Sequence, residues 1–94
     1  MEITLRDNPE KKQFEFDLEG ELGRIEYIIA KGDTIYLTHT EVPESLGGKG
    51  YGRVIVDLAL KEVDARKLKL VSLCPYVAGY IRKNPEWERL LKIH

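Results

Sequence analysis

The feature that most constrains the fold of this chain is a glycine-rich segment, residues 41–53, with the sequence EVPESLGGKGYGR. It holds four of the eight glycines and joins a β-rich run, Thr34–Val42, to the longest helical pattern, Tyr51–Arg66. Glycine has no Cβ, so such a turn can adopt positive φ and present its backbone N–H groups to a ligand. Ahead of a helix N-terminus these groups favour an anion, above all phosphate. A glycine-rich connection without a ligand is the alternative.

The spacing of the glycines excludes two common nucleotide motifs. A P-loop requires G-x-x-x-x-G-K-[ST], whereas Lys49 is followed by Gly50 and has no hydroxyl residue after it. The dinucleotide fingerprint G-x-G-x-x-G fails as well, because Arg53 or Ile55 stands where its third glycine is required. Any phosphate ligand must therefore be bound by a different type of loop.

The first half of the chain predicts an antiparallel meander of four strands. Apolar and polar residues alternate in short runs, and turn-forming residues separate the runs. We expect the hairpin of the second and third strands to have one face open to water. The expected strands are Ile3–Arg6, Phe14–Leu18, Ile25–Ile29 and Thr34–Val42, and the expected turns are Asp7-Asn8-Pro9, Glu19-Gly20-Glu21 and Lys31-Gly32-Asp33.

The second half predicts a central helix, one more strand and C-terminal helices. Polar residues recur every three or four positions in Tyr51–Arg66, which leaves a broad apolar face to pack on the sheet. The apolar run Leu68–Leu73 predicts a strand covered on both faces and parallel to Thr34–Val42. Pro75 starts a helix that runs to about Lys83, and Pro85 starts a last short helix that contains Trp87, Leu90 and Leu91. The fold class is therefore α/β (α+β).

Composition limits the classes of function. The 94 residues predict one domain, residues 1–94. Fifteen basic and sixteen acidic side chains give a net charge of −1, so we expect no binding to nucleic acid or to acidic membranes. No apolar run approaches the ~20 residues of a membrane span or forms a signal peptide, which favours a cytoplasmic protein. One cysteine and two histidines predict neither a disulfide nor a metal site. We expect a monomer or a weak homodimer.

Three segments together resemble one acyltransferase family. Residues 47–52, GGKGYG, resemble the pyrophosphate loop Q/R-x-x-G-x-G/A of the GCN5-related N-acetyltransferase (GNAT) superfamily, with Gly47 in place of the usual Gln or Arg. The segments THTEV (residues 38–42) and LCPYVAGYIRKNPEW (residues 73–87) resemble its small stand-alone branch, the YjdJ-like predicted N-acetyltransferases. The resemblance covers nearly the whole chain.

This resemblance implies a minimal GNAT-like fold that binds acetyl-CoA or coenzyme A where the fourth and fifth strands splay apart. The pyrophosphate would lie on the amides of residues 48–53, the pantetheine arm along Glu41 and Val42, and the thioester between Thr40 and Cys74. The cofactor-binding residues implied are Thr40, Glu41, Val42, Gly47, Gly48, Lys49, Gly50, Tyr51, Gly52, Arg53, Cys74, Pro75 and Tyr80.

Four candidate catalytic residues follow, Tyr80, His39, Glu41 and Cys74, each with a structural alternative. Tyr80 stands where many GNAT enzymes place a tyrosine that protonates the departing thiolate, which suits a phenol of pKa ~10. Packing of its ring in the core is the alternative. His39 and Glu41 lie two residues apart on a strand and therefore share a face, where they could deprotonate an amine. A hydrogen-bonded histidine and a solvated carboxylate would be their structural roles. Tyr36, Tyr76 and Trp87 are interpreted as core or cleft wall.

Cys74 precedes the helix that Pro75 begins, and the N–H groups of a helix N-terminus lower the pKa of a nearby thiol. It could therefore be a nucleophile, a contact to the cofactor or a small residue of the core.

Two functions follow. The first is an acyl-CoA-dependent N-acyltransferase that acetylates an unidentified amine. The second is a CoA-binding or regulatory module without turnover, because the chain has no helices between its first two strands to help hold an acceptor.

Overall fold

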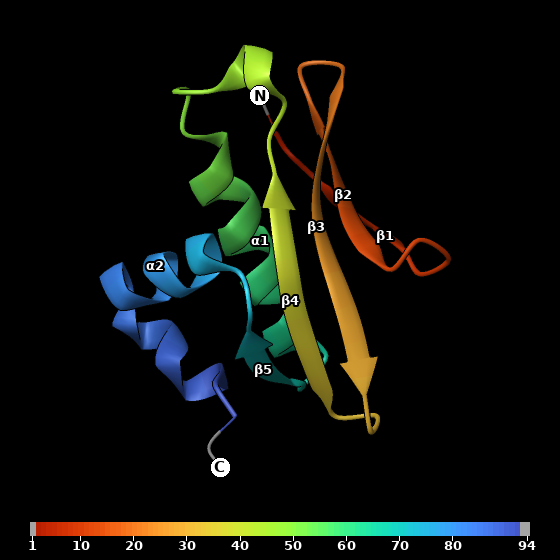
Figure 1. Ribbon diagram of the computed structural model, residues 1–94, viewed down its shortest axis with the longest axis vertical. Coiled ribbons are helices and arrows are strands. Elements are labelled where there is room, and N and C mark those ends of the chain that lie inside the picture. Colours follow the sequence, from red (N-terminus) through yellow and green to blue (C-terminus); the bar gives the residue numbers. More distant parts are fainter. Residues whose placement is uncertain (1, 93–94) are drawn as a thin grey trace.

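The computed structural model describes residues 2–92 and contains a five-stranded sheet in the order β1-β2-β3-β4-β5 (Figure 1). Strands β1 to β4 form an antiparallel meander, and β5 pairs parallel to β4. This topology confirms both the four-strand meander and the parallel pair predicted from the sequence. The strands are β1 (Leu5–Asn8), β2 (Gln13–Leu18), β3 (Glu21–Ala30), β4 (Thr34–Glu41) and β5 (Lys69–Ser72).

The helices begin and end close to their predicted bounds. Helix α1 covers Tyr51–Ala65, with Arg66 as its C-cap, and α2 covers Pro75–Lys83. Residues 2–92 also contain two 3₁₀ helices, η1 (Glu44–Leu46) and η2 (Pro85–Leu90). Within residues 2–92, none of these helices has the length and apolar character that crossing a bilayer requires.

Helix α1 packs across one face of the sheet, and α2 lies beside it near β5 (Figure 1). The apolar side of α1 includes Ile55, Ala59 and Val63, which are fully buried. These residues form a single cluster with apolar residues of the strands. We call the side of the sheet that carries these strand residues the inner face. The strand members of the cluster are Phe14, Phe16, Leu18, Ile25, Tyr27, Ile35, Leu37 and Leu70.

Strand β4 extends beyond its partner β5 at the end of the sheet that leads to α1. Pairing between them ends at Leu37 and Ser72, followed by one hydrogen bond from Leu73 N–H to the Leu37 carbonyl (2.9 Å). Meanwhile β4 continues along β3 to Glu41. Thr38 is an extra residue in β4, since His39 pairs with Glu26 while Leu37 pairs with Tyr27, and such a bulge bends a strand. The predicted splaying of the fourth and fifth strands is therefore present.

The first strand lies two residues later than predicted. Asp7 and Asn8, which the sequence predicts as a turn, pair with Phe14 and Gln13 in the sheet. The prediction was wrong because these polar side chains find partners on neighbouring elements. Asp7 accepts a hydrogen bond from Tyr27 Oη (2.7 Å), and Asn8 donates one to Glu15 (3.0 Å).

The two predictions about exposure have different outcomes. The outer face of the β2–β3 hairpin is open to water at Asp17 and Ile28, as predicted, but Glu15 on the same face is only 7% exposed. Its carboxylate accepts hydrogen bonds from Arg6 (3.0 Å), Asn8 (3.0 Å) and Gln13 (2.7 Å). Strand β5 is not covered on both faces, since Val71 is half-buried and the adjoining Leu73 is 59% exposed.

The Glu15 network predicts a pH dependence of stability. Hydrogen bonds from Gln13, then Arg6 and Asn8, lower the pKa of Glu15 from its ordinary value of 4.5 to about 2. A depressed pKa in the folded state contributes stability above about pH 4.5 that is lost as the pH falls towards 2. Glu15→Gln should therefore destabilise the protein at pH 7, and the difference from wild type should shrink between pH 4.5 and 2. Denaturant unfolding at several pH values measures this, with the exposed Glu10→Gln as the control. A difference that stays constant with pH would contradict the assignment.

Candidate functional site

The glycine loop leaves the N-terminus of α1 open. Gly48 and Gly50 adopt left-handed backbone conformations, with φ of +84° and +83°. Gly50 is the N-cap of α1, no side chain caps the helix, and its first turn contains no acidic residue. The partial positive charge of this helix end is therefore not neutralised locally, which favours an anion in front of it.

A cavity of about 380 Å³ borders this loop, and we call it the loop cavity. Its wall combines the end of β4, the glycine turn and the first turn of α1. The lining residues are Val42, Leu46, Gly47, Gly48, Gly50, Tyr51, Gly52, Arg53 and Tyr76. Lys49 is absent from this lining, because its ammonium group pairs with Glu19 (3.4 Å), to which the Tyr51 hydroxyl also donates.

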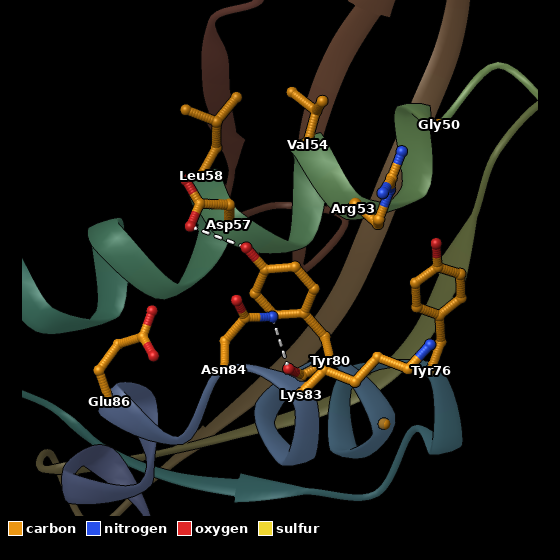
Figure 2. Close-up of a pocket in the computed structure, with 11 residues that line it drawn as sticks. Gly50, Arg53, Val54, Asp57, Leu58, Tyr76, Tyr80, Lys83, Asn84 and Glu86 are labelled. Carbon is orange, nitrogen blue, oxygen red and sulfur yellow. Dashed lines mark hydrogen bonds between the residues drawn. The ribbon is translucent and has the colours of Figure 1, made fainter.

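A second cavity of about 850 Å³ lies between α1 and α2, and we call it the interhelix cavity (Figure 2). It shares Gly50, Arg53 and Tyr76 with the loop cavity, so the two adjoin. Arg53 stands at the end next to Gly50, while Asp57 and Glu86 lie towards the other end (Figure 2). Its remaining lining residues are Val54, Leu58, Gly79, Tyr80, Lys83 and Asn84.

Tyr80 enters the interhelix cavity from α2 and reaches α1. Its hydroxyl donates a hydrogen bond to Asp57 Oδ1 (3.0 Å), and the other oxygen of Asp57 pairs with Lys61 (2.9 Å). Burial and, next, the hydrogen bond to Asp57 raise the pKa of Tyr80 to about 12. Tyr80 is thus a neutral phenol whose one proton is directed at Asp57.

Cys74 and Thr40 meet beside the part of β4 that has no β5 partner. The thiol of Cys74 donates to Thr40 Oγ1 (3.4 Å), and Cys74 is 5% exposed. Burial alone would raise the pKa of Cys74. When the thiol ionises, hydrogen bonds donated to the sulfur by the Thr40 hydroxyl and by the backbone N–H groups of Tyr76 and Val77 outweigh this effect and lower the pKa. Cys74 and Thr40, between which the resemblance would place the thioester, are thus in direct contact with each other, and neither lines the loop cavity or the interhelix cavity.

His39 and Glu41 lie on the outer face of the sheet, away from both cavities. His39 Nε2 is 2.9 Å from Glu41 Oε1, and Arg24 Nη2 donates to the same oxygen (3.2 Å). The side chains of His39 and Glu41 are 52% and 48% exposed. The hydrogen bond from His39 and the charge of Arg24 lower the pKa of Glu41. The structure therefore divides the predicted catalytic residues between the two sides of β4.

Sequence reasoning gave Asp57 no functional role, and it left Tyr76 open between core and cleft wall. Asp57 was identified only as part of the polar stripe of α1, and its position one turn after Arg53 was the available signal. Tyr76 follows Cys74 by two residues but lines both cavities with 46% exposure, so it is cleft wall and not core. Over residues 2–92, no three His, Cys, Asp or Glu side chains are grouped to hold a metal ion.

Comparison with known proteins identifies similar sequences. The profile of the GCN5-related N-acetyl-transferase family matches residues 13–90. The chain is 31% identical to Protein NATD1 of Xenopus tropicalis over 87 residues, which is 88% of this chain and 78% of that protein. It is 30% identical to Protein NATD1 of Mus musculus, again over 88% of this chain and 77% of the relative.

A solved structure supports the fold independently. The NMR solution structure of a GCN5-like protein from Staphylococcus aureus superposes with a TM-score of 0.70 at 20% sequence identity. The alignment covers 95% of this chain and 87% of that one. At this identity the likeness concerns the arrangement of the helices and strands.

The Cys74 environment predicts a shifted titration of the thiol. Cys74 is the only cysteine, so alkylation by iodoacetamide reports on it alone. The rate should rise with pH around a midpoint below that of an ordinary thiol. Thr40→Val removes a hydrogen bond that lowers the pKa and should move the midpoint upwards. Thr4→Val, at an exposed position, is the control and should leave it unchanged. Equal midpoints in wild type and Thr40→Val would contradict the role of Thr40.

Proposed function

The chain belongs to the GCN5-related N-acetyltransferase family, and from this premise we propose that it binds acetyl-CoA and transfers the acetyl group to an amine. Acetyl-CoA is the small-molecule partner in this proposal, and the acceptor is an amine of unassigned identity. The reaction forms an amide bond and breaks the thioester C–S bond. The amine loses a proton, and the departing thiolate gains one.

The observation that carries this proposal is the open N-terminus of α1 behind the left-handed residues Gly48 and Gly50. A pyrophosphate in the loop cavity would meet backbone N–H groups and the positive end of a helix dipole. The guanidinium group of Arg53 lines the same cavity and adds a positive charge. The adjoining cavities provide room for a ligand that extends away from the loop.

The free edge of β4 supports the proposed path of the pantetheine arm. Beyond Leu37, β5 no longer supplies hydrogen bonds to β4, whose backbone continues to Glu41. An amide-containing chain could take the place of the missing strand there. The thioester would then lie near Thr40 and Cys74, and backbone N–H groups would have to turn from Cys74 to polarise its carbonyl.

The remaining steps need a base and an acid. His39 and Glu41 are the proposed bases for the amine, acting from the outer face of β4. Tyr80 or Cys74 is the proposed group that assists the thiolate. Because the Tyr80 proton is directed at Asp57, its hydroxyl must turn from that carboxylate before it can serve a thiolate.

A CoA-binding module without turnover is the second candidate. Four contacts favour it: Glu41 is paired with His39 and with Arg24, Tyr80 is hydrogen-bonded to Asp57, and Cys74 is hydrogen-bonded to Thr40. Each proposed acid or base is therefore already occupied by a partner. An assay for turnover distinguishes the two candidates directly.

Titration with acetyl-CoA tests the binding site. Backbone amide signals of residues 47–53 should shift, and Gly50→Val should abolish binding. Valine is strained at φ +83°, and a Cβ there would lie 2.9 Å from Arg53 Nη2. Gly32→Val is the matched control, since Gly32 has φ +76° with nothing within 4 Å of its added Cβ. Undiminished affinity in folded Gly50→Val would reject the site. Release of free CoA on addition of an amine library then separates enzyme from binding module.

Tyr80→Phe tests the role of the phenol. If Tyr80 protonates the thiolate, turnover should fall by roughly 10²- to 10⁴-fold, as for a positioned general acid, while CoA affinity is retained. The Tyr36→Phe variant, on the outer face of the sheet, should behave as wild type. Unchanged turnover in Tyr80→Phe would limit the hydroxyl to its hydrogen bond with Asp57.

A further inference from the structure

Tyr76 occupies the boundary between the loop cavity and the interhelix cavity. It extends from the first turn of α2 towards the first turn of α1, and it lines both cavities (Figure 2). Because it is 46% exposed, burial of its ring does not by itself account for this position.

A contact with Gly52 shows where the hydroxyl lies. A Cβ atom built on Gly52 would lie 2.6 Å from Tyr76 Cζ and closer still to Oη. No side chain at position 52 could therefore coexist with this placement of the tyrosine. Gly52 has an ordinary helical position within α1, so positive φ does not explain why it is glycine. The close approach of Tyr76 offers a reason that is specific to this chain.

Arg53 approaches the same helix end. Its Nη2 atom lies 2.9 Å from the position that a Cβ on Gly50 would occupy. The Arg53 guanidinium group and the Tyr76 hydroxyl are thus two side-chain hydrogen-bond donors at the first turn of α1, and no side chain caps that turn (Figure 2). An anion in front of the helix would therefore lie close to both donors.

We propose that Tyr76 is a cofactor-binding residue whose hydroxyl donates a hydrogen bond to the diphosphate of coenzyme A, and that position 52 is glycine so that the hydroxyl can reach it. This inference rests on the proposed function, because it assigns the diphosphate to the N-terminus of α1. It adds a residue from α2 to a phosphate site that the sequence assigns to the loop and α1 alone. Binding of the diphosphate would then link the two helices that form the interhelix cavity.

The test measures the affinity of coenzyme A and of dephospho-CoA by calorimetry. Dephospho-CoA keeps the diphosphate and lacks the 3′-phosphate. Comparing the two ligands therefore shows which of these two groups Tyr76 contacts. Tyr76→Phe should weaken both ligands by the same factor, roughly tenfold or more, as expected for one hydrogen bond to a charged group. Tyr36→Phe removes a phenol hydroxyl on the outer face and should bind both ligands as wild type does.

A double-mutant cycle tests the role of Gly52. Gly52→Ala should displace the exposed Tyr76 side chain and weaken coenzyme A binding by a factor similar to that of Tyr76→Ala. In the Tyr76→Ala background, Gly52→Ala should cause no further loss, because nothing remains to be displaced. Circular dichroism of each variant verifies that the fold is retained. Additive losses would show that alanine obstructs the ligand itself, and would overturn the proposed reason for glycine.

Other outcomes overturn the assignment of Tyr76. Unchanged or tighter binding by Tyr76→Phe would show that the hydroxyl does not contact the ligand. A loss with coenzyme A but not with dephospho-CoA would assign the contact to the 3′-phosphate. Failure of the wild type to bind coenzyme A would reject the proposed function together with this inference, whereas binding by wild type with equal affinity in Tyr76→Phe rejects this inference alone.

Discussion

The parallel hydrogen bonds between β4 and β5 end at Leu37 and Ser72, and the candidate residues Thr40 and Cys74 lie just beyond that end. Two local features lie next to it. Pro75 cannot extend a strand and begins α2, and β4 has a bulge at Thr38. The backbone of β4 then continues to Glu41 without β5 beside it. Backbone polar groups at such an edge require water or a ligand as partner, which makes this the natural place for an extended amide-containing chain.

Polar contacts, and not the apolar core, connect α2 and η2 to the exposed side of α1. Tyr80 is hydrogen-bonded to Asp57, and Arg89 makes two hydrogen bonds to Asp64 (2.9 and 2.8 Å). An exposed ion pair contributes only about 0–1 kcal/mol, so the Arg89–Asp64 pair adds little to stability. On their other side, α2 and η2 are held by the core, in which Val77, Ile81, Trp87 and Leu90 are buried.

The features that could be predicted from the sequence are those that depend on short stretches of the chain. The glycine turn, the proline at the start of α2 and the four-strand meander all depend on residues close in sequence. The sequence did not predict the register of β1 or the burial of Glu15, because both depend on side chains that meet only in the sheet. The hydrogen bond between Tyr80 and Asp57 joins residues 23 positions apart, and periodicity reveals which face of a helix is polar but not which partner it meets.

Successive side chains at the end of β4 point to opposite faces of the sheet, which separates the proposed bases from the proposed position of the thioester. Thr40 pairs with the core residue Ile25 and contacts Cys74, so it belongs to the inner face, whereas His39 and Glu41 belong to the outer face. A thioester beside Thr40 and a base at His39 or Glu41 would therefore lie on opposite sides of one strand. An amine activated on the outer face could reach the thioester only past the end of β5, where β4 has no neighbour. The same early end of β5 that would admit the cofactor would thus also admit the acceptor, and neither needs the core to open.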